Sequence, residues 1–199
     1  TIEIFHNGCL LTTIKTQLAG IHNVYNTLAV VAALNEAGVE LKKLAQYFYP
    51  FTGMGRRFQK VCEFNGITVY DDYAHHPTEI KAALQAAASK FGKENVVAVF
   101  QPHRFTRLQS LWKEFLTAFE NAGRVIVTDV YAASEDSIEG INGENFAAEL
   151  SCEYVSGNMQ DVARKLMPSL KKGDVVIGLG AGTITNLGKE LCKLETILR

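Results

Sequence analysis

Between residues 67 and 199, short apolar segments alternate with longer stretches of helical periodicity, and this alternation most constrains the fold. The apolar segments are unbroken by polar residues, so each strand should be covered on both faces. Strands separated by helices and short loops pair in parallel, which predicts a doubly wound, mostly parallel α/β sheet. The predicted strands are Ile67–Tyr70, Val96–Phe100, Val125–Val127 and Val175–Ile177, and the predicted helices are Thr78–Phe91, Leu108–Phe119, Asn142–Leu150, Asp161–Leu170 and Thr185–Leu194.

The first 66 residues contain part of a similar pattern but do not complete one. Short strands are expected on both sides of residues 6–8, because Asn-Gly is a strong hairpin signal. Helices are expected over Val24–Ala37 and Leu41–Phe48, and a strand over Phe58–Phe64. We interpret residues 1–66 as the truncated end of a preceding α/β domain and residues 67–199 as a complete Rossmann-like domain.

The composition argues against two classes of partner. The 20 Lys and Arg residues balance 21 Asp and Glu, whereas a nucleic-acid-binding protein would need a basic face. The longest apolar run, Leu28–Leu34, is far shorter than the roughly 20 residues of a membrane span, so no membrane insertion is expected. The sequence has no signal-peptide pattern, which favours a cytoplasmic location. Cys9, Cys62, Cys152 and Cys192 form no C-x-x-C pair and are expected to be reduced.

Polar or glycine-rich segments follow each predicted strand of residues 67–199. Ligands of open α/β sheets bind outside the carboxyl ends of the strands, so a site is expected there. Arg104 and Arg107 favour the capture of an anion over two solvated surface arginines, because a guanidinium can bind a carboxylate or phosphate with two hydrogen bonds. The four segments are Asp71–Pro77, Gln101–Arg107, Asp129–Asp136 and Gly178–Thr183.

Other residues in these segments allow two interpretations. Asp72 and His75 could orient a nucleotide sugar or relay a proton, or they could satisfy backbone N–H groups at a helix start. The adjacent His75 and His76 point apart and have no third ligand at helical spacing, so no metal site is predicted. The glycines of Gly178–Thr183 fail the G-x-G-x-x-G pattern, which favours close strand-to-helix packing over a phosphate loop.

Four motifs, taken in order, resemble those of the Mur ligases of peptidoglycan synthesis. Gly20–Asn26 is similar to the family's G-x-H-N-x-x-N stretch, and Arg56–Gln59 is similar to its R-R-F-Q motif. Asp72–Pro77 is similar to D-Y-A-H-H-P, and Gln101–Arg107 to the Q-P-H-R-[YF]-T-R segment of the member that adds L-alanine. Asp129–Ala133 also fits that member. Four ordered motifs are much more specific than one.

The resemblance implies an ATP-dependent ligase that joins L-alanine to UDP-N-acetylmuramate through an acyl phosphate. By the family pattern, His22, Asn23 and Asn26 would contact adenine. From the residues alone, Asn23 is at least as good a helix N-cap. Arg57 and Asp72 would bind the phosphate or the ribose of the nucleotide.

The same resemblance assigns residues to the reacting groups. His75, Arg104 and Arg107 would be catalytic and would face the carboxylates and the amino acid, and Tyr73 would line the same space. Cations suit this chemistry, because two anionic reactants and ATP otherwise repel one another.

One departure from the family pattern limits what this chain can do alone. It contains no G-x-x-x-x-G-K-[ST] loop, and the family carries that loop and its acidic Mg²⁺ ligands upstream of the adenine motif. We therefore expect a C-terminal fragment, with residues 1–66 ending the ATP-binding domain and residues 67–199 forming the amino-acid-binding domain. The fragment alone should be inactive. The alternatives are the sister ligase that recycles a murein tripeptide, a non-catalytic nucleotide-binding module and a dinucleotide-dependent dehydrogenase.

Overall fold

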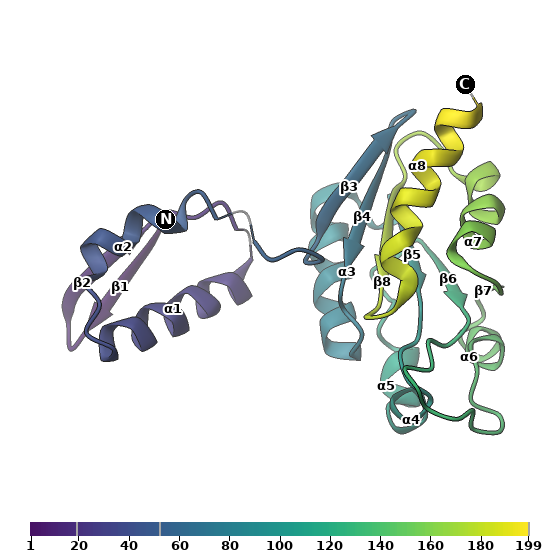
Figure 1. Cartoon of the computed structure of the whole chain (residues 1–199), viewed down its shortest axis with the longest axis horizontal. Helices are drawn as coiled ribbons and strands as arrows, with labels where there is room; N and C mark the ends of the chain where they lie inside the picture. The colour runs from purple at the N-terminus through teal and green to yellow at the C-terminus, as the bar shows by residue number, and fades with distance from the viewer. Residues whose placement is uncertain (19, 52, 199) are drawn as a thin grey trace. The chain divides into compact units, whose positions relative to one another are not determined.

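A computed structural model describes residues 1–18, 20–51 and 53–198, without the side chains of His22 and Leu198. The chain divides into two compact units, Thr1–Met54 and Gly55–Arg199 (Figure 1). The division precedes the boundary expected after residue 66, because residues 59–64 form a strand of the second unit's sheet. Within the described residues, no helix combines the length and the apolar character needed to cross a bilayer.

The first unit is a hairpin with two helices. Strands β1 (Ile2–His6) and β2 (Cys9–Ile14) pair antiparallel around Asn7 and Gly8, as the Asn-Gly signal predicts. Both turn residues have positive φ, 49° and 79°, which this tight turn requires. Helices α1 (Ile21–Glu36) and α2 (Leu41–Phe48) follow. The buried apolar side chains of this unit are Ile4, Ile14, Val31 and Leu41.

Helix α1 starts three residues earlier than its apolar pattern predicts. Gly20 is the N-cap, with a φ of 95°, and none of the described side chains caps the helix. Asn23 therefore lies inside the first turn, and the expectation that it caps the helix is wrong. Its backbone carbonyl accepts a hydrogen bond from Thr27 Oγ1 at 2.8 Å.

The second unit is built around one six-stranded sheet with the order β3-β4-β8-β5-β6-β7. Strands β4 to β8 run parallel, and β3 is an antiparallel edge strand, which confirms the mostly parallel α/β fold. The strands are β3 (Gln59–Phe64), β4 (Ile67–Asp72), β5 (Val96–Phe100), β6 (Arg124–Thr128), β7 (Glu153–Val155) and β8 (Val175–Leu179).

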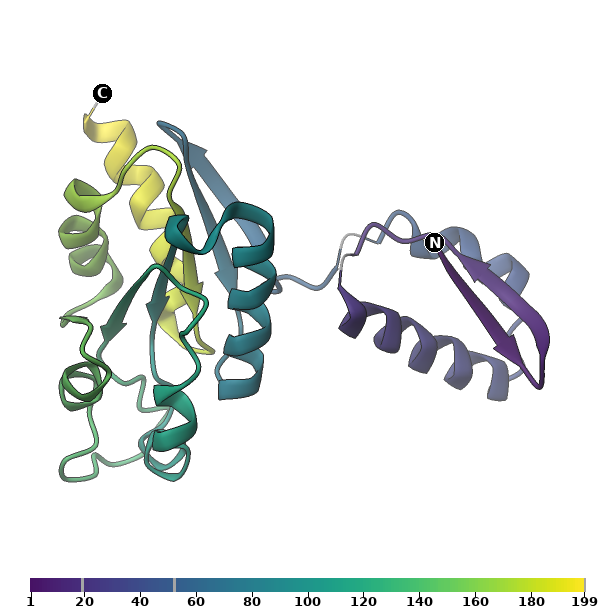
Figure 2. The same ribbon diagram turned by 180° about the vertical axis from the view of Figure 1, so that it is seen from behind.

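Helices cover both faces of this sheet. Figure 1 shows α7 and α8 over one face, and Figure 2, turned by 180°, shows α3 over the other. Neighbouring strand residues face opposite layers, because Phe100 packs with α3, α4, α5 and α6, whereas Val99 packs with α7 and α8. The helices are α3 (Pro77–Phe91), η1 (Lys93–Asn95), α4 (Phe105–Ser110), α5 (Trp112–Leu116), α6 (Gly143–Leu150), α7 (Met159–Leu166), η2 (Met167–Ser169), η3 (Thr183–Asn186) and α8 (Leu187–Leu198).

Two features of the second unit differ from the sequence prediction. The single helix expected over Leu108–Phe119 is broken at Leu111, whose φ of −115° and ψ of 21° are not helical. Strand β7 was not predicted, because Glu153–Val155 is not an unbroken apolar run like the other parallel strands of the sheet.

A disulfide also departs from expectation. Cys62 in β3 and Cys192 in α8 are bonded to each other, so the prediction that all four cysteines are reduced is wrong for this pair. Their separation of 130 residues hides the pairing in the sequence, and the packing of α8 against β3 brings them together. Cys9 and Cys152 are free thiols.

The order of the strands places four loops at one edge. Strand β8 lies between β4 and β5, and β6 follows β5, so the loops after these strands are neighbours at their carboxyl ends. Backbone bonds tie them together: the N–H of Gly180 donates to the carbonyl of Asp72 at 3.1 Å, and that of Gln101 donates to Leu179 at 3.0 Å. This edge, after β4, β8, β5 and β6, is hereafter called the carboxyl edge.

Candidate active site

Asp72 holds the loop that follows β4. Its Oδ1 accepts from the backbone N–H of Ala74 at 2.8 Å, and its Oδ2 accepts from that of Phe58 at 2.7 Å. Burial raises the pKa of the Asp72 carboxyl, although these two hydrogen bonds and the charge of Arg57 oppose the rise. The carboxylate thus satisfies backbone groups, one of the two roles open from the sequence, and a ribose contact stays a prediction.

The Nδ1 atom of His75 contacts its own loop and helix α3, whereas Nε2 makes no contact with the loop. Its Nδ1 lies 2.9 Å from the carbonyl oxygen of Tyr73 and 3.4 Å from Oε2 of Glu79. A carbonyl oxygen accepts but cannot donate, so Nδ1 carries the proton. When the ring is neutral, Nε2 therefore offers a lone pair.

Glu79 orients His75 and starts α3. Its Oε2 accepts from the backbone N–H groups of His75 and His76, at 3.0 and 3.3 Å, as part of a capping box. Burial by itself would raise the pKa of Glu79, but these N–H groups and the charges of His75 and Arg57 lower it overall. The side chains that cap α3 are therefore those of His76 and Glu79, whereas capping was one of the two roles expected of Asp72 and His75.

His103 follows β5 and has the opposite proton arrangement. Its Nδ1 lies 3.0 Å from Nη1 of Arg107. A guanidinium can only donate, so Nδ1 is unprotonated and the neutral ring carries its proton on Nε2. Burial and the charges of Arg107, His75 and Arg104 lower the pKa of His103, which keeps the ring neutral near pH 7.

The two imidazoles lie close together at the carboxyl edge. The ring centroids of His75 and His103 are 6.0 Å apart, and His103 stacks on Tyr131 at 5.4 Å. One neutral ring offers a lone pair at Nε2, and the other offers an N–H. A pair of this kind can take a proton from one group of a ligand while donating to another.

Arg104 lies where the loops after β5 and β6 meet. Its backbone N–H donates to the carbonyl of Tyr131 at 2.9 Å, and its φ of 71° is in the left-handed region. The side chain is half exposed, and Nη1 lies 4.0 Å from Oε1 of Glu135, a distance too long for a direct hydrogen bond. Most of the donors of Arg104 are therefore available to an anion.

Glu135 itself belongs to the loop after β6. Its carboxylate accepts from the hydroxyl of Thr106 at 2.7 Å and from its backbone N–H at 3.1 Å. These two hydrogen bonds lower the pKa of Glu135. The carboxylate fixes the start of α4 and also limits the positive charge around Arg104.

Arg56 ties the segment before β3 to the carboxyl edge through three contacts. Its Nε donates to Oδ2 of Asp71 at 3.0 Å, and its Nη2 donates to the carbonyl of Gly180 at 2.7 Å. The same Asp71 oxygen accepts from Thr185 Oγ1 at 2.7 Å. The guanidinium carbon of Arg56 also lies 4.9 Å from the ring centre of Tyr73. The side chain of Arg56 thus makes its contacts within the protein.

Arg57 is more open than Arg56. Its side chain is 53% exposed, and Nη1 lies 3.6 Å from Oε1 of Glu79. Its guanidinium carbon lies 5.9 Å from the ring centre of Tyr73. Of the two adjacent arginines, Arg57 therefore has the donors left for a phosphate, as its sequence assignment requires.

The glycines after β8 serve close packing. A Cβ on Gly180 would lie 2.7 Å from the carbonyl oxygen of Gln101, and one on Gly182 would lie 2.6 Å from the side chains of Gln101 and Tyr131. Gln101 Oε1 also accepts from the backbone N–H of Ile184 at 2.9 Å. The side chains from β5 and β6 fill the space beside these glycines, which supports the packing interpretation.

Of the predicted residues, the structure gathers those of the second unit. Asn23 and Asn26 are in the first two turns of α1, in the first unit, and the side chain of His22 lies outside the described part of the chain. The residues gathered at or next to the carboxyl edge are Arg57, Asp72, Tyr73, His75, Arg104 and Arg107.

Sequence reasoning missed several residues of the site. His103 and Tyr131 stood inside the segments expected at this edge, so their position was a usable signal. Glu79 lies inside the predicted helix Thr78–Phe91 and was given no role in the site. The pairing of Arg56 with Asp71 has no signal in one sequence, because 15 residues separate them.

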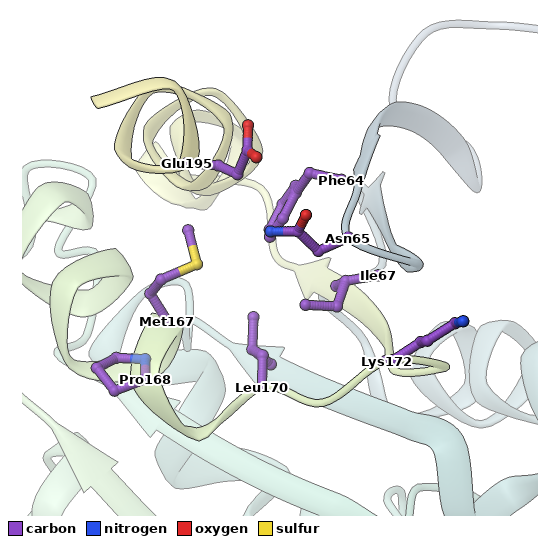
Figure 3. Close-up of a pocket in the computed structure, with 8 residues that line it drawn as sticks. All are labelled: Phe64, Asn65, Ile67, Met167, Pro168, Leu170, Lys172 and Glu195. Carbon is purple, nitrogen blue, oxygen red and sulfur yellow. The ribbon is translucent and has the colours of Figure 1, made fainter. Parts of the chain in front are cut away.

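A pocket elsewhere has a different character. Its volume is about 450 Å³, and it lies at the amino ends of β4 and β8, the opposite end of these strands from the carboxyl edge. Figure 3 shows Glu195 of α8 on one side and the β3–β4 hairpin on another. The lining is mainly apolar, so we do not assign the charged reactants to it. Its residues are Phe64, Asn65, Ile67, Met167, Pro168, Leu170, Lys172 and Glu195.

Comparison with known proteins identifies relatives. Residues 56–182 match the family described as "Mur ligase, glutamate ligase domain". The UDP-N-acetylmuramate–L-alanine ligase of Caldicellulosiruptor bescii is 47% identical over 184 residues, which cover 90% of this chain and 40% of that protein. The enzyme of the same name from Desulfotalea psychrophila is 41% identical and covers 98% and 43%. This chain thus spans about two fifths of the length of these curated relatives.

Solved structures show the same fold. The crystal structure of UDP-N-acetylmuramate–alanine ligase from Thermotoga maritima matches with a TM-score of 0.75 and 28% identity, covering 97% of this chain and 42% of that one. A murein peptide ligase from Psychrobacter arcticus matches with a TM-score of 0.66 and 21% identity, covering 92% and 38%, which supports a shared fold alone.

Proposed function

The chain belongs to the Mur ligase family, whose glutamate ligase domain it contains, and from this we propose that it is the C-terminal part of an ATP-dependent ligase that adds L-alanine to UDP-N-acetylmuramate. The names and the 47% and 41% identity of the relatives support this substrate pair. The activity belongs to the whole protein, which we expect in the bacterial cytoplasm.

The observation that carries the proposal is the group of Arg104, Arg107, His75 and His103 at one edge of the sheet. An amino-acid substrate brings a carboxylate, which needs cations, and an amine, which must lose a proton before it attacks. The edge supplies both kinds of group within one cluster.

The two arginines would hold the carboxylate of L-alanine. Arg104 has a half-exposed guanidinium with only a distant carboxylate partner. Arg107 uses Nη1 for His103, at 3.0 Å from Nδ1 and 3.3 Å from the backbone carbonyl. Its remaining donors can add to those of Arg104, and Nε2–H of His103 can add a further one.

His75 would accept the proton from the attacking amine. Its Nδ1–H is held by the Tyr73 carbonyl, with Glu79 close by, so the lone pair of a neutral ring lies on Nε2. The carboxylate of Glu79 stabilises the charge that forms on the ring, as an orienting acid does for a histidine base. Tyr73 would line the same space.

ATP supplies the phosphoryl group that activates the lactyl carboxylate, so that the amine forms an amide as phosphate leaves. Arg57 fits a phosphate, because its guanidinium is exposed. Asp72 would help to position the nucleotide. Both of its carboxylate oxygens already accept backbone N–H groups, so a ribose hydroxyl would donate to one of these same oxygens. Asn23, Asn26 and His22 would contact adenine.

We assign no Mg²⁺ ligand among the described residues of this chain. In the described part of the chain, no three His, Cys, Asp or Glu side chains come together as metal ligands. The acidic ligands are expected in the upstream part of the protein, and we derive no step from a metal held by this chain.

The test compares the full-length enzyme with this chain. With ATP, Mg²⁺ and UDP-N-acetylmuramate, the full-length enzyme should release phosphate when L-alanine is added and should not do so when a murein tripeptide replaces it. This chain alone should release none. A preference for the tripeptide would support the sister ligase instead, and turnover by the isolated chain would refute the proposal that the activity needs the whole protein.

A further inference from the structure

Cys62 and Cys192 join the edge strand β3 to the last helix, α8. We propose that these two cysteines are a thiol–disulfide modification site, which reacts with a low-molecular-weight disulfide such as glutathione disulfide and reversibly staples α8 to the sheet. The site is separate from the carboxyl edge and does not depend on the reaction that the whole protein performs.

The packing of α8 on β3 places the two cysteines side by side. A Cβ on Gly188 of α8 would lie 2.9 Å from Val61 of β3, so the helix backbone lies directly against this strand. Cys62 Sγ lies 3.8 Å from the carbonyl oxygen of Gly188. The two Cα atoms are 6.7 Å apart, within the range that a disulfide spans. Oxidation therefore needs no rearrangement of the fold.

The bond joins an edge strand to the last helix of the described chain. Strand β3 is at the edge of the sheet and pairs only with β4 among the described residues. Beyond Cys192, the last turn of α8 leaves Ile197 77% exposed. The 450 Å³ pocket opens between this turn and the β3–β4 hairpin, where Glu195 and Phe64 line it (Figure 3). The bond thus holds two walls of this pocket together.

Neither cysteine is fully buried, although both pack against the core between the sheet and α7 and α8. Cys62 and Cys192 are each half-buried. In a reducing compartment a disulfide persists only while an oxidant maintains it, so a pair positioned like this one responds to the thiol balance of its surroundings.

The chemistry balances with the glutathione couple. One cysteine thiolate attacks a sulfur of glutathione disulfide, forms a mixed disulfide and releases one glutathione thiolate. The second cysteine, as its thiolate, then attacks the protein sulfur of the mixed disulfide and releases the second glutathione. Two protein thiols are oxidised, one glutathione disulfide is reduced, and the reverse sequence with two glutathione molecules reopens the bond.

The other two cysteines are internal controls. Cys152 is a free thiol whose pKa burial raises to about 11, so little of its reactive thiolate is present near pH 7. Cys9 is exposed, is also a free thiol and belongs to the first unit. Both lie outside the pair, because Cys62 and Cys192 are bonded to each other.

The first experiment counts thiols in the purified chain. It is equilibrated with mixtures of reduced and oxidised glutathione, unfolded in acid, alkylated and weighed by mass spectrometry. In oxidising mixtures two of the four cysteines should take up the alkylating reagent, and peptide mapping should identify them as Cys9 and Cys152. In reducing mixtures all four should react. Four reactive thiols across the whole series, or stable glutathione adducts instead of an internal bond, would overturn the proposal.

The second experiment measures the consequence. Closing a loop of 130 residues restricts the unfolded chain, so the Tm of the second unit should be about 10 °C higher in the oxidised protein. Cys192→Ala should abolish this difference, whereas the matched control Cys152→Ala should keep it. An equal redox-dependent shift in Cys192→Ala would contradict the assignment. Hydrogen exchange should also speed up on reduction in α8 and β3, and not in α3.

Discussion

Arg107 donates to Nδ1 of His103 across 3.0 Å, and this contact decides which ring nitrogen is left for a ligand. The ring must carry its proton on Nε2, opposite to the arrangement in His75, whose Nδ1–H is held by a carbonyl. His75 and His103 therefore carry the proton on different ring nitrogens, because their hydrogen-bond partners differ.

Replacing Arg107 should change the titration of His103. Burial and three nearby side chains, Arg107 first among them, lower the pKa of His103. Arg107→Ala removes one cation and should move this pKa upward, toward the ordinary value of about 6.5. NMR titration of the histidine Cε1–H signals in the isolated chain measures the change. His6, in the first unit, serves as the control and should not move. A fall, or no change, in the pKa of His103 would refute the role of Arg107.

The arginines should also matter for catalysis. In the full-length enzyme, Arg104→Ala should cost about 2–5 kcal/mol in kcat/KM for L-alanine, as expected when a carboxylate loses its charged partner in a binding site. The matched control is Arg164→Ala on α7, an exposed arginine whose ion-pair partner is Asp161. Unchanged kinetics in Arg104→Ala would remove this residue from the site.

Glu79→Ala should destabilise the chain in a pH-dependent way. The folded state lowers the pKa of Glu79, so its contribution is present above the unfolded value of about 4.3 and is lost as the pH falls through the folded value. We expect a loss of about 1 kcal/mol at pH 7, the usual contribution of a helix cap, which shrinks toward zero in acid. Urea unfolding at pH 7 and near pH 3 measures both. An equal loss at the two pH values would contradict the linkage, and the exposed Glu120→Ala is the control.

Asp71→Asn should destabilise the second unit more than the loss of a surface ion pair does. The Asp71 side chain is 9% exposed and that of Arg56 is 25% exposed, so the substitution leaves a partly buried cation without its counter-charge. Within the described residues, Oδ1 of Asp71 is buried with no hydrogen-bond partner, so Oδ2 makes the contacts to Arg56 and Thr185. A loss of about 3 kcal/mol in urea unfolding is expected. Lys60→Gln, which breaks the exposed Lys60–Glu63 pair, should change stability by less than about 1 kcal/mol.

Gly182→Ala should disturb the edge by steric contact. The added Cβ would lie 2.6 Å from Gln101 and Tyr131, so these side chains must move. We expect a loss of about 1–3 kcal/mol in the unfolding free energy and a higher KM for L-alanine in the full-length enzyme. Gly55→Ala is the control, because its nearest contact would be an ordinary 3.5 Å. If both variants behaved alike, the glycine would have no packing role.

The layered α/β fold was predictable because buried parallel strands have a strong signal. Val96–Phe100 is apolar throughout and was placed at its observed bounds. The break at Leu111 was not predictable, because the apolar spacing of Leu108, Phe115 and Phe119 continues across it. Those side chains share one core whether or not the helix between them is continuous.

The site was predictable as a region but not as a set of contacts. The rule that ligands bind at the carboxyl ends of strands led to the segments that hold His75, His103 and Arg107. It could not show that Arg107 turns toward His103, or that Arg56 turns toward Asp71, since these contacts depend on the packing of loops from different strands. The disulfide was missed for the same reason, because its partners are adjacent only after α8 packs on β3.

The position of β8 has a consequence for how the protein is made and degraded. This strand is among the last elements in the chain, yet it lies between β4 and β5, which each pair with it. A ribosome that has released residues 1–170 has therefore produced a sheet with its central strand missing and two apolar strand edges open. Such edges favour aggregation and recognition by chaperones. Folding of this unit must wait until β8 has been translated, and a protease that removes β8 and α8 would split the sheet at its centre rather than trim its margin.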